Sequence, residues 1–131
     1  MTSDTNILVI DDEYLSSYIS EKLIKKIKQD SQVTTYLDGK KAIDKLVEIK
    51  NEDINLLPNY IFLDLFMPTM GGWEFLEQFR ALNIDPQGRC KIYILTCSLF
   101  PDDVEKSADY NIVADYLIKP LDFDKLKKIF E

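Results

Sequence analysis

The sequence predicts an α/β domain built on one open parallel sheet, and three observations support this fold class. Short apolar runs alternate with helical patterns along the chain. No repeat, low-complexity segment or linker rich in Gly, Ser or Pro interrupts this alternation. The length of 131 residues fits one domain with a substantial core. We therefore expect a single domain over residues 1–131, with five βα units, right-handed crossovers and helices on both faces of the sheet.

The first half of the chain contains two predicted strands and two predicted helices. Ile7–Ile10 is a continuous apolar run, which is typical of a strand buried on both faces of a parallel sheet. Val33–Leu37 mixes apolar and polar residues and is typical of an edge strand. Two helices are predicted from apolar residues at helical spacing, which are Leu15, Ile19, Leu23 and Ile27, and then Ala42, Ile43, Leu46 and Val47.

The second half continues the alternation. Tyr60–Leu63 and Ile92–Leu95 are further buried strands, and Val113–Ile118 is a second edge strand. Pro101–Tyr110 is predicted as a helix, because Pro101 suits the first helical position and the acidic residues after it suit the first turn. Two more helical faces are formed by Phe75, Leu76, Phe79 and Leu82, and by Phe123, Leu126, Ile129 and Phe130.

Composition narrows the classes of function. The formal net charge of −7 argues against direct binding to nucleic acid, and against binding to an anionic membrane, through general electrostatics. The absence of histidine excludes Ser-His-Asp and Cys-His catalysis and histidine metal sites on this chain. Cys90 and Cys97 lack metal-ligand spacing, and we expect both to be reduced core residues of a cytoplasmic protein. No signal peptide or membrane-length apolar run is present, so we expect no membrane insertion.

Polar residues follow four of the predicted strands. Asp11 and Asp12 follow the first strand, Asp64 the third, Thr96 the fourth and Lys119 the fifth. In a parallel sheet all carboxyl ends lie at one edge, which is where open α/β sheets bind their ligands. The sequence therefore predicts that three carboxylates, a hydroxyl and an ammonium group meet at one rim.

The charges at this rim favour a cation. Two carboxylates about 4 Å apart repel by roughly 4 kcal/mol at an effective dielectric constant of about 20. Lys119 offsets part of this repulsion and a divalent ion would offset more, and a set of oxygen ligands suits Mg²⁺ better than zinc or copper. A carboxylate beside Mg²⁺, a lysine and a hydroxyl is also suited to phosphoryl transfer, with the aspartate as nucleophile.

Four segments, in this order, resemble the receiver domains of two-component response regulators. They are Leu8–Glu13, Asp64–Gly72, Leu95–Thr96 and Tyr116–Pro120. The resemblance covers nearly the whole chain. It implies a flavodoxin-like, doubly wound, five-stranded parallel sheet in the order 2-1-3-4-5 with five helices on both faces, an order that periodicity alone does not fix.

The resemblance also implies the chemistry of the acidic residues. Asp64 would accept the phosphoryl group. Asp12 and Asp64 would ligate Mg²⁺ directly, together with the backbone carbonyl of Phe66, and Asp11 would act mainly through a metal-bound water.

The residues at the remaining family positions would contact the phosphoryl group and change conformation in response to it. Thr96 would bond a phosphoryl oxygen and Lys119 would pair with it. Tyr116 stands where the family has a switch aromatic, which turns inward when Thr96 moves, and the bond from Lys119 to Pro120 would be a cis peptide.

Two positions depart from the family pattern. Phe66 is bulky and apolar where many relatives carry a polar residue beside the path of the attacking water, so we expect slow loss of phosphate. Cys97 stands where a small residue is common and would modestly narrow access to the site, or have no effect.

The function implied is a phosphorylation-controlled signalling switch. A histidine kinase or a histidine phosphotransfer protein would supply the phosphoryl group, and the face built by the fourth helix, fifth strand and fifth helix would bind an unknown downstream protein. The chain would catalyse only its own phosphorylation and dephosphorylation. The alternative is a constitutive protein-interaction module with the same fold that is not phosphorylated. The sequence leaves open the choice between a monomer and a phosphorylation-dependent homodimer.

Two other classes fit the sequence less well. A phosphatase resembling the haloacid dehalogenases needs a second aspartate two positions after its nucleophile, and Phe66 occupies that position. A flavin-binding domain needs a phosphate loop after the first strand, where Asp11 and Asp12 would repel the phosphate.

Overall fold

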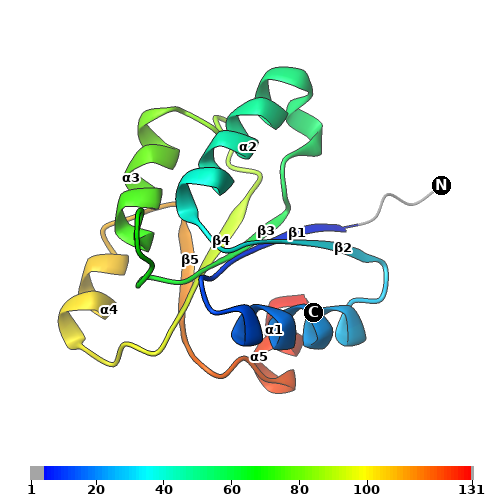
Figure 1. The fold of residues 1–131 in the computed structure, drawn as a ribbon, viewed down its shortest axis with the longest axis vertical. Coiled ribbons are helices and arrows are strands. Elements are labelled where there is room, and N and C mark those ends of the chain that lie inside the picture. The colour runs from blue at the N-terminus through cyan, green and yellow to red at the C-terminus, as the bar shows by residue number, and fades with distance from the viewer. Residues whose placement is uncertain (1–4, 131) are drawn as a thin grey trace.

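The computed structural model describes residues 5–130, which form a parallel sheet between two layers of helices (Figure 1). The strand order is β2-β1-β3-β4-β5, and every neighbouring pair is parallel, which confirms the expected fold class. The strands are β1 (Thr5–Ile10), β2 (Ser31–Tyr36), β3 (Tyr60–Leu63), β4 (Lys91–Thr96) and β5 (Val113–Ile118).

The helices divide between the two faces of the sheet. In Figure 1, α2 and α3 lie over one face and α1 and α5 over the other. None of the helices within residues 5–130 is both long and apolar enough to cross a membrane. The helices are α1 (Tyr14–Ile27), α2 (Gly39–Glu52), α3 (Gly72–Ala81), α4 (Pro101–Ser107) and α5 (Phe123–Phe130), with a short 3₁₀ helix, η1 (Ile54–Leu56).

Each face of the sheet carries its own apolar core. Under α2 and α3, side chains such as Leu46, Phe75 and Phe79 cover the central strands. Under α1 and α5, Ile24 and Leu126 are fully buried against the opposite face. Because both faces are covered, β1, β3 and β4 are apolar along most of their length, as the continuous runs in the sequence predicted.

Some element boundaries differ from the predicted ones. β2 begins at Ser31 and ends at Tyr36, because its ladder with β1 pairs residues 5–10 with residues 31–36. α4 ends at Ser107, and the chain then turns so that Tyr110 is buried. Leu82 lies just beyond the end of α3 and is 45% exposed, while Ile84 is buried in its place.

Only the second half of the apolar stripe predicted on α1 packs against the sheet, where Leu23 and Ile27 contact the core. Ser17, Ser20 and Ile24 are buried, whereas Leu15 is 68% exposed and Ile19 is 47% exposed. Small serine side chains let the helix approach the sheet closely. The first two turns of α1 therefore present an exposed apolar surface.

Ring and cation–π contacts join α3 to α4 and to the turn that follows α4. The Trp73 ring, on α3, stacks on the Tyr110 ring with their centroids 5.8 Å apart. The Nζ atom of Lys106, on α4, lies 4.9 Å from the centre of the Trp73 ring, a cation–π contact. The Tyr110 hydroxyl donates a hydrogen bond of 2.7 Å to Glu77 on α3. Trp73 is partly buried.

Candidate functional site

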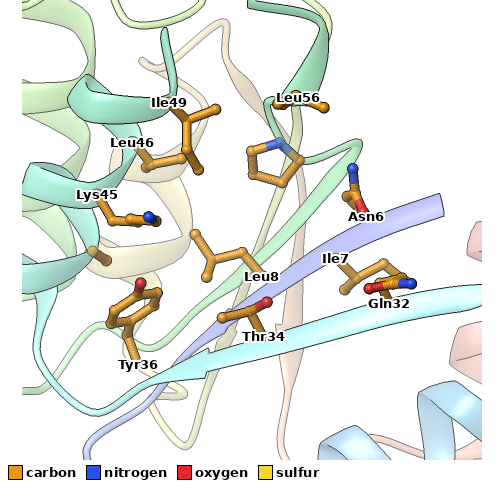
Figure 2. A pocket seen from close by; sticks show the side chains of 12 residues that line it. Asn6, Ile7, Leu8, Gln32, Thr34, Tyr36, Lys45, Leu46, Ile49 and Leu56 are labelled. Atoms are coloured by element: carbon orange, nitrogen blue, oxygen red, sulfur yellow. The ribbon is translucent and has the colours of Figure 1, made fainter. Parts of the chain in front are cut away.

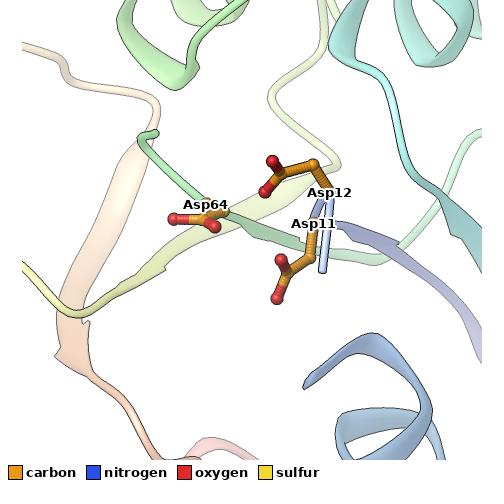
Figure 3. Close-up of side chains that lie close together, drawn as sticks. All are labelled: Asp11, Asp12 and Asp64. Atoms are coloured by element: carbon orange, nitrogen blue, oxygen red, sulfur yellow. The ribbon is translucent and has the colours of Figure 1, made fainter. Parts of the chain in front are cut away.

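Three carboxylates meet at the carboxyl ends of β1 and β3 (Figure 3). Asp11, Asp12 and Asp64 each offer an oxygen, and these atoms all lie within 4.8 Å of one another. Asp11 is 2% exposed and Asp64 is 6% exposed, while Asp12 is half-buried. The sequence therefore identified correctly the acidic residues that converge at this edge.

The sheet itself positions two of these acids. The backbone N–H of Asp64 donates to the carbonyl of Ile10 at 2.9 Å, and that of Asp11 donates to the carbonyl of Tyr36 at 3.0 Å. These bonds continue the ladders of β1 with β3 and with β2, so each aspartate stands directly after the last paired residue of its strand.

Lys119 is held among the carboxylates. Its Nζ atom lies 2.9 Å from Oδ2 of Asp11, 3.3 Å from Oδ2 of Asp64 and 3.5 Å from Oε1 of Glu13. Its side chain is only 10% exposed. The backbone N–H of Lys119 donates to the carbonyl of Thr96 at 2.8 Å, and the following peptide bond to Pro120 is cis, as the resemblance implied.

Two contacts that the sequence did not reveal hold Asp11 in place. The Ser16 hydroxyl donates to Oδ2 of Asp11 at 2.8 Å, and the backbone N–H of Glu13 donates to Oδ1 at 3.0 Å. The only signal in the sequence was a serine in the first turn of the helix that follows the acidic pair. These bonds fix the carboxylate that also contacts Lys119.

The carboxylate cluster carries more negative charge than Lys119 neutralises. Burial, together with the neighbouring charge of Asp11, raises the pKa of Asp64 above its usual value, although Lys119 and the Phe66 N–H act in the opposite direction. Burial on its own would lower the pKa of Lys119, but the hydrogen bond to Asp11 and the charges of Asp64 and Asp11 raise it overall. Lys119 is therefore a permanent cation at neutral pH, and it does not fully compensate the carboxylates.

The loop after β3 runs very close to the backbone of the site. A Cβ atom on Gly72 would lie 2.6 Å from the carbonyl oxygen of Asp64, so a glycine is required there. The Phe66 N–H lies 3.4 Å from Oδ1 of Asp64, and the Phe66 side chain is 58% exposed at the rim. The part that the Phe66 carbonyl would take in metal binding stays a prediction.

A second set of contacts runs from Thr96 toward α4. Thr96 is fully buried, and its hydroxyl oxygen accepts a long hydrogen bond of 3.4 Å from the Ser98 N–H. The Ser98 carbonyl accepts a hydrogen bond of 3.0 Å from the Tyr116 hydroxyl, and the Ser98 hydroxyl donates to Asp103 on α4. The two predicted switch residues, Thr96 and Tyr116, thus contact the same intermediate residue, and their switching role stays a prediction.

The two cysteines differ in environment. Cys90 is buried, as expected, and burial beside Asp85 raises the pKa of its thiol to about 12. The expectation that Cys97 is a core residue was wrong, because it follows the last residue of β4 and its side chain is exposed at the rim of the site.

The donor set fits a hard divalent cation. Asp11, Asp12 and Asp64 supply only oxygen atoms, which are the ligands that Mg²⁺ prefers, and their combined charge exceeds what Lys119 neutralises. This acidic pocket is therefore capable of binding a metal ion.

The chain belongs to the response regulator receiver domain family, whose model matches residues 7–131. Receiver domains of this family act in phosphorylation-based two-component signalling, where they interact with histidine kinases and downstream effectors.

Individual relatives agree with this assignment. A probable methanogenesis regulatory protein, FilR2, of Methanothrix harundinacea is 29% identical over 95% of this chain and 78% of its own length. The probable C4-dicarboxylate response regulator DctR of Halalkalibacterium halodurans is 27% identical over 92% of this chain, which spans only 47% of that protein. The crystal structure of a two component response regulator from Cytophaga hutchinsonii superposes with a TM-score of 0.87 at 25% identity, covering 98% of this chain and 96% of that one.

Proposed function

We propose that Asp64 accepts a phosphoryl group, with Mg²⁺ as cofactor, from a histidine kinase or a histidine phosphotransfer protein in the cytoplasm. The observation that supports this most directly is the contact of Lys119 with both Asp11 and Asp64, inside a carboxylate cluster at the end of the sheet. In this proposal the chain catalyses only its own phosphorylation and dephosphorylation.

The chemistry follows from the positions of the side chains. An Asp64 carboxylate oxygen attacks the phosphorus of a donor phosphohistidine, so a P–O bond forms and the P–N bond breaks, with the imidazole leaving and taking up a proton. Lys119 pairs with an oxygen of the transferred group, and the Thr96 hydroxyl donates a hydrogen bond to another. Asp12, Asp64 and the Phe66 carbonyl would hold Mg²⁺, with Asp11 acting mainly through a metal-bound water, and the ion would supply neutralisation of the negative charge on that group.

The exposed apolar surface of α1 supports the same proposal. Leu15 and Ile19 line an open cavity of about 390 Å³ together with Pro120 and Leu121, and Lys119 lines it too. A donor protein docked on this surface would bring its phosphohistidine to the site. We therefore assign the first two turns of α1 to the phosphodonor.

The contacts of Ser98 suggest how phosphorylation of Asp64 would affect α4. A phosphoryl oxygen that draws the Thr96 hydroxyl would weaken its bond with Ser98, which also contacts Asp103 and Tyr116. α4 would then shift between two arrangements and change the affinity of the α4–β5–α5 face for a downstream protein. Leu99 and Phe100 are 73% and 70% exposed beside this path, which is consistent with a contact surface.

The test is intact mass spectrometry after incubation with acetyl phosphate, with and without Mg²⁺. One Mg²⁺-dependent phosphoryl adduct is expected for the wild type and for Asp53→Asn, a distant helix-capping aspartate, but not for Asp64→Asn. An adduct that persists in Asp64→Asn would overturn the site assignment. Absence of any adduct, combined with no Mg²⁺ binding, would favour the constitutive interaction module.

The docking proposal has its own readout. Leu15→Glu is expected to slow transfer from a phosphohistidine protein at least about tenfold, since it buries a charge in an apolar contact, and to leave the acetyl phosphate reaction unchanged. Equal slowing with both donors would place the defect in the site rather than in docking.

A further inference from the structure

A cavity of about 180 Å³ lies between α2 and the β1–β2 edge of the sheet (Figure 2). Leu8 forms its floor, and Leu46 and Ile49 of α2 form its roof. Leu56 and Pro58 close one side. None of the acidic residues, nor Thr96 or Lys119, lines this cavity, so the phosphorylation chemistry does not account for it.

The sequence of β2 explains why the cavity exists. Residues of a strand alternate between its two faces, and Gln32, Thr34 and Tyr36 all line the cavity on the α2 side. Their ladder partners on β1 are Asn6, Leu8 and Ile10. Polar side chains on an edge strand give the apolar face of α2 little to pack against, so the helix leaves an open space above β2.

The cavity has an apolar middle and polar ends. Figure 2 shows the ammonium group of Lys45 and the hydroxyl of Tyr36 at one end, and the side-chain amides of Asn6 and Gln32 at the other. This pattern, an apolar body with a few polar groups that fix orientation, is the usual character of a small-molecule site.

Lys45 supplies the charge complementarity. Its Nζ atom is 3.4 Å from Oε1 of Glu48, and the two side chains are 46% and 58% exposed. An exposed pair of this kind contributes little and is readily exchanged. Lys45 can therefore turn to an anionic group inside the cavity, next to the Tyr36 hydroxyl as a hydrogen-bond donor.

We propose that this cavity binds a small aromatic carboxylate that carries a polar substituent opposite the carboxylate. A dry apolar cavity of about 150 Å³ holds benzene, so 180 Å³ accommodates one six-membered ring with small substituents. The ring lies between Leu8 and the α2 side chains, the carboxylate pairs with Lys45 and accepts from Tyr36, and the substituent bonds the amides of Asn6 and Gln32.

The experiment is a titration of the ¹⁵N-labelled full chain with 4-hydroxybenzoate, followed by amide chemical shifts. We expect shifts confined to β1, β2 and α2, with a dissociation constant of roughly 0.1–1 mM, as befits a ligand of this size. Absence of shifts at about 10 mM, or shifts spread over the molecule, would overturn the proposal.

Matched variants test the two parts of the site. Thr34→Phe fills the cavity and should abolish binding, whereas Thr35→Phe, on the opposite face of the same strand, should not. Lys45→Met should weaken binding of 4-hydroxybenzoate about tenfold and that of neutral 4-hydroxybenzyl alcohol less than twofold, while Lys41→Met changes neither.

Three outcomes would contradict the assignment. They are equal effects of Thr34→Phe and Thr35→Phe, equal effects of Lys45→Met and Lys41→Met, and shifts of the same amides on raising the protein concentration alone. The last would assign the cavity to a second copy of the chain.

Discussion

Replacing Lys119 by Met removes the only cation that contacts the described carboxylate cluster at both Asp11 and Asp64. The distances of 2.9 Å and 3.3 Å correspond to roughly 5–6 kcal/mol of attraction each at an effective dielectric constant of about 20. The cost of burying the lysine offsets much of this attraction. Removing one partner of a buried pair typically costs about 3–5 kcal/mol, because the remaining charge is left unpaired, and we expect a loss in that range.

Lys40→Met is a closely matched control. Lys40 lies 2.9 Å from Asp44, the same distance as Lys119 from Asp11. The side chains of Lys40 and Asp44 are 57% and 62% exposed, however, whereas those of Lys119 and Asp11 are 10% and 3% exposed. An exposed helical pair contributes about 0.3–0.5 kcal/mol, so burial alone should separate the two variants by severalfold.

Urea denaturation followed by circular dichroism, without Mg²⁺, gives the free energy of unfolding of each variant. Mg²⁺ should then stabilise Lys119→Met more than the wild type, because a divalent ion replaces the lost charge and binds more tightly without its competitor. At ten times its dissociation constant the ion adds about 1.4 kcal/mol. A loss below about 1 kcal/mol, or one equal to that of Lys40→Met, would refute the reasoning.

Three further predictions concern the rim and the thiols. Phe66→Asn should shorten the lifetime of the phosphorylated protein roughly tenfold, if the new asparagine amide gives the attacking water one hydrogen bond of about 1.4 kcal/mol. The decay of the phosphorylated form, measured by intact mass, checks this prediction. An unchanged lifetime would exclude Phe66 as the cause of slow hydrolysis. Iodoacetamide at neutral pH should label Cys97 and spare Cys90, which peptide mapping would show. Because the pKa of the Cys90 thiol is raised in the folded protein, the thiol ionises first in the unfolded chain as the pH rises. The free energy of unfolding should therefore fall between pH 9.0 and about 12, by at most about 1.4 kcal/mol per pH unit. A Cys90→Ala variant whose free energy of unfolding falls equally steeply with pH would contradict this origin.

The candidate site could be predicted from the sequence because parallel strands all end at one edge. Once the predicted strands placed Asp11, Asp64 and Lys119 at three strand ends, their presence at one edge required no knowledge of loops or side-chain rotamers. The family resemblance supplied the strand order, which periodicity leaves open. Contacts such as Ser16 with Asp11 could not be foreseen, since they depend on how α1 is set against the sheet.

Burial on α1 and after β4 was harder to predict for a different reason. Helical spacing identifies an apolar stripe but not whether that stripe faces the sheet or another molecule. On α1, Ser17 and Ser20 are buried on the side that faces the sheet, and Leu15 is exposed near Lys119. Cys97 is one residue past the end of β4, where the alternation rule no longer fixes the direction of a side chain.

The cation–π contact between α3 and α4 also provides an optical probe. Trp73 is the single tryptophan of the chain, and the ammonium group of Lys106 on α4 lies 4.9 Å from its ring. Indole emission depends on nearby charge and on exposure to water, so any displacement of α4 would change the wavelength or yield of fluorescence. The native, unlabelled protein therefore carries a reporter at the element that is expected to move, and Lys106→Met would identify how much of the signal arises from that one charge.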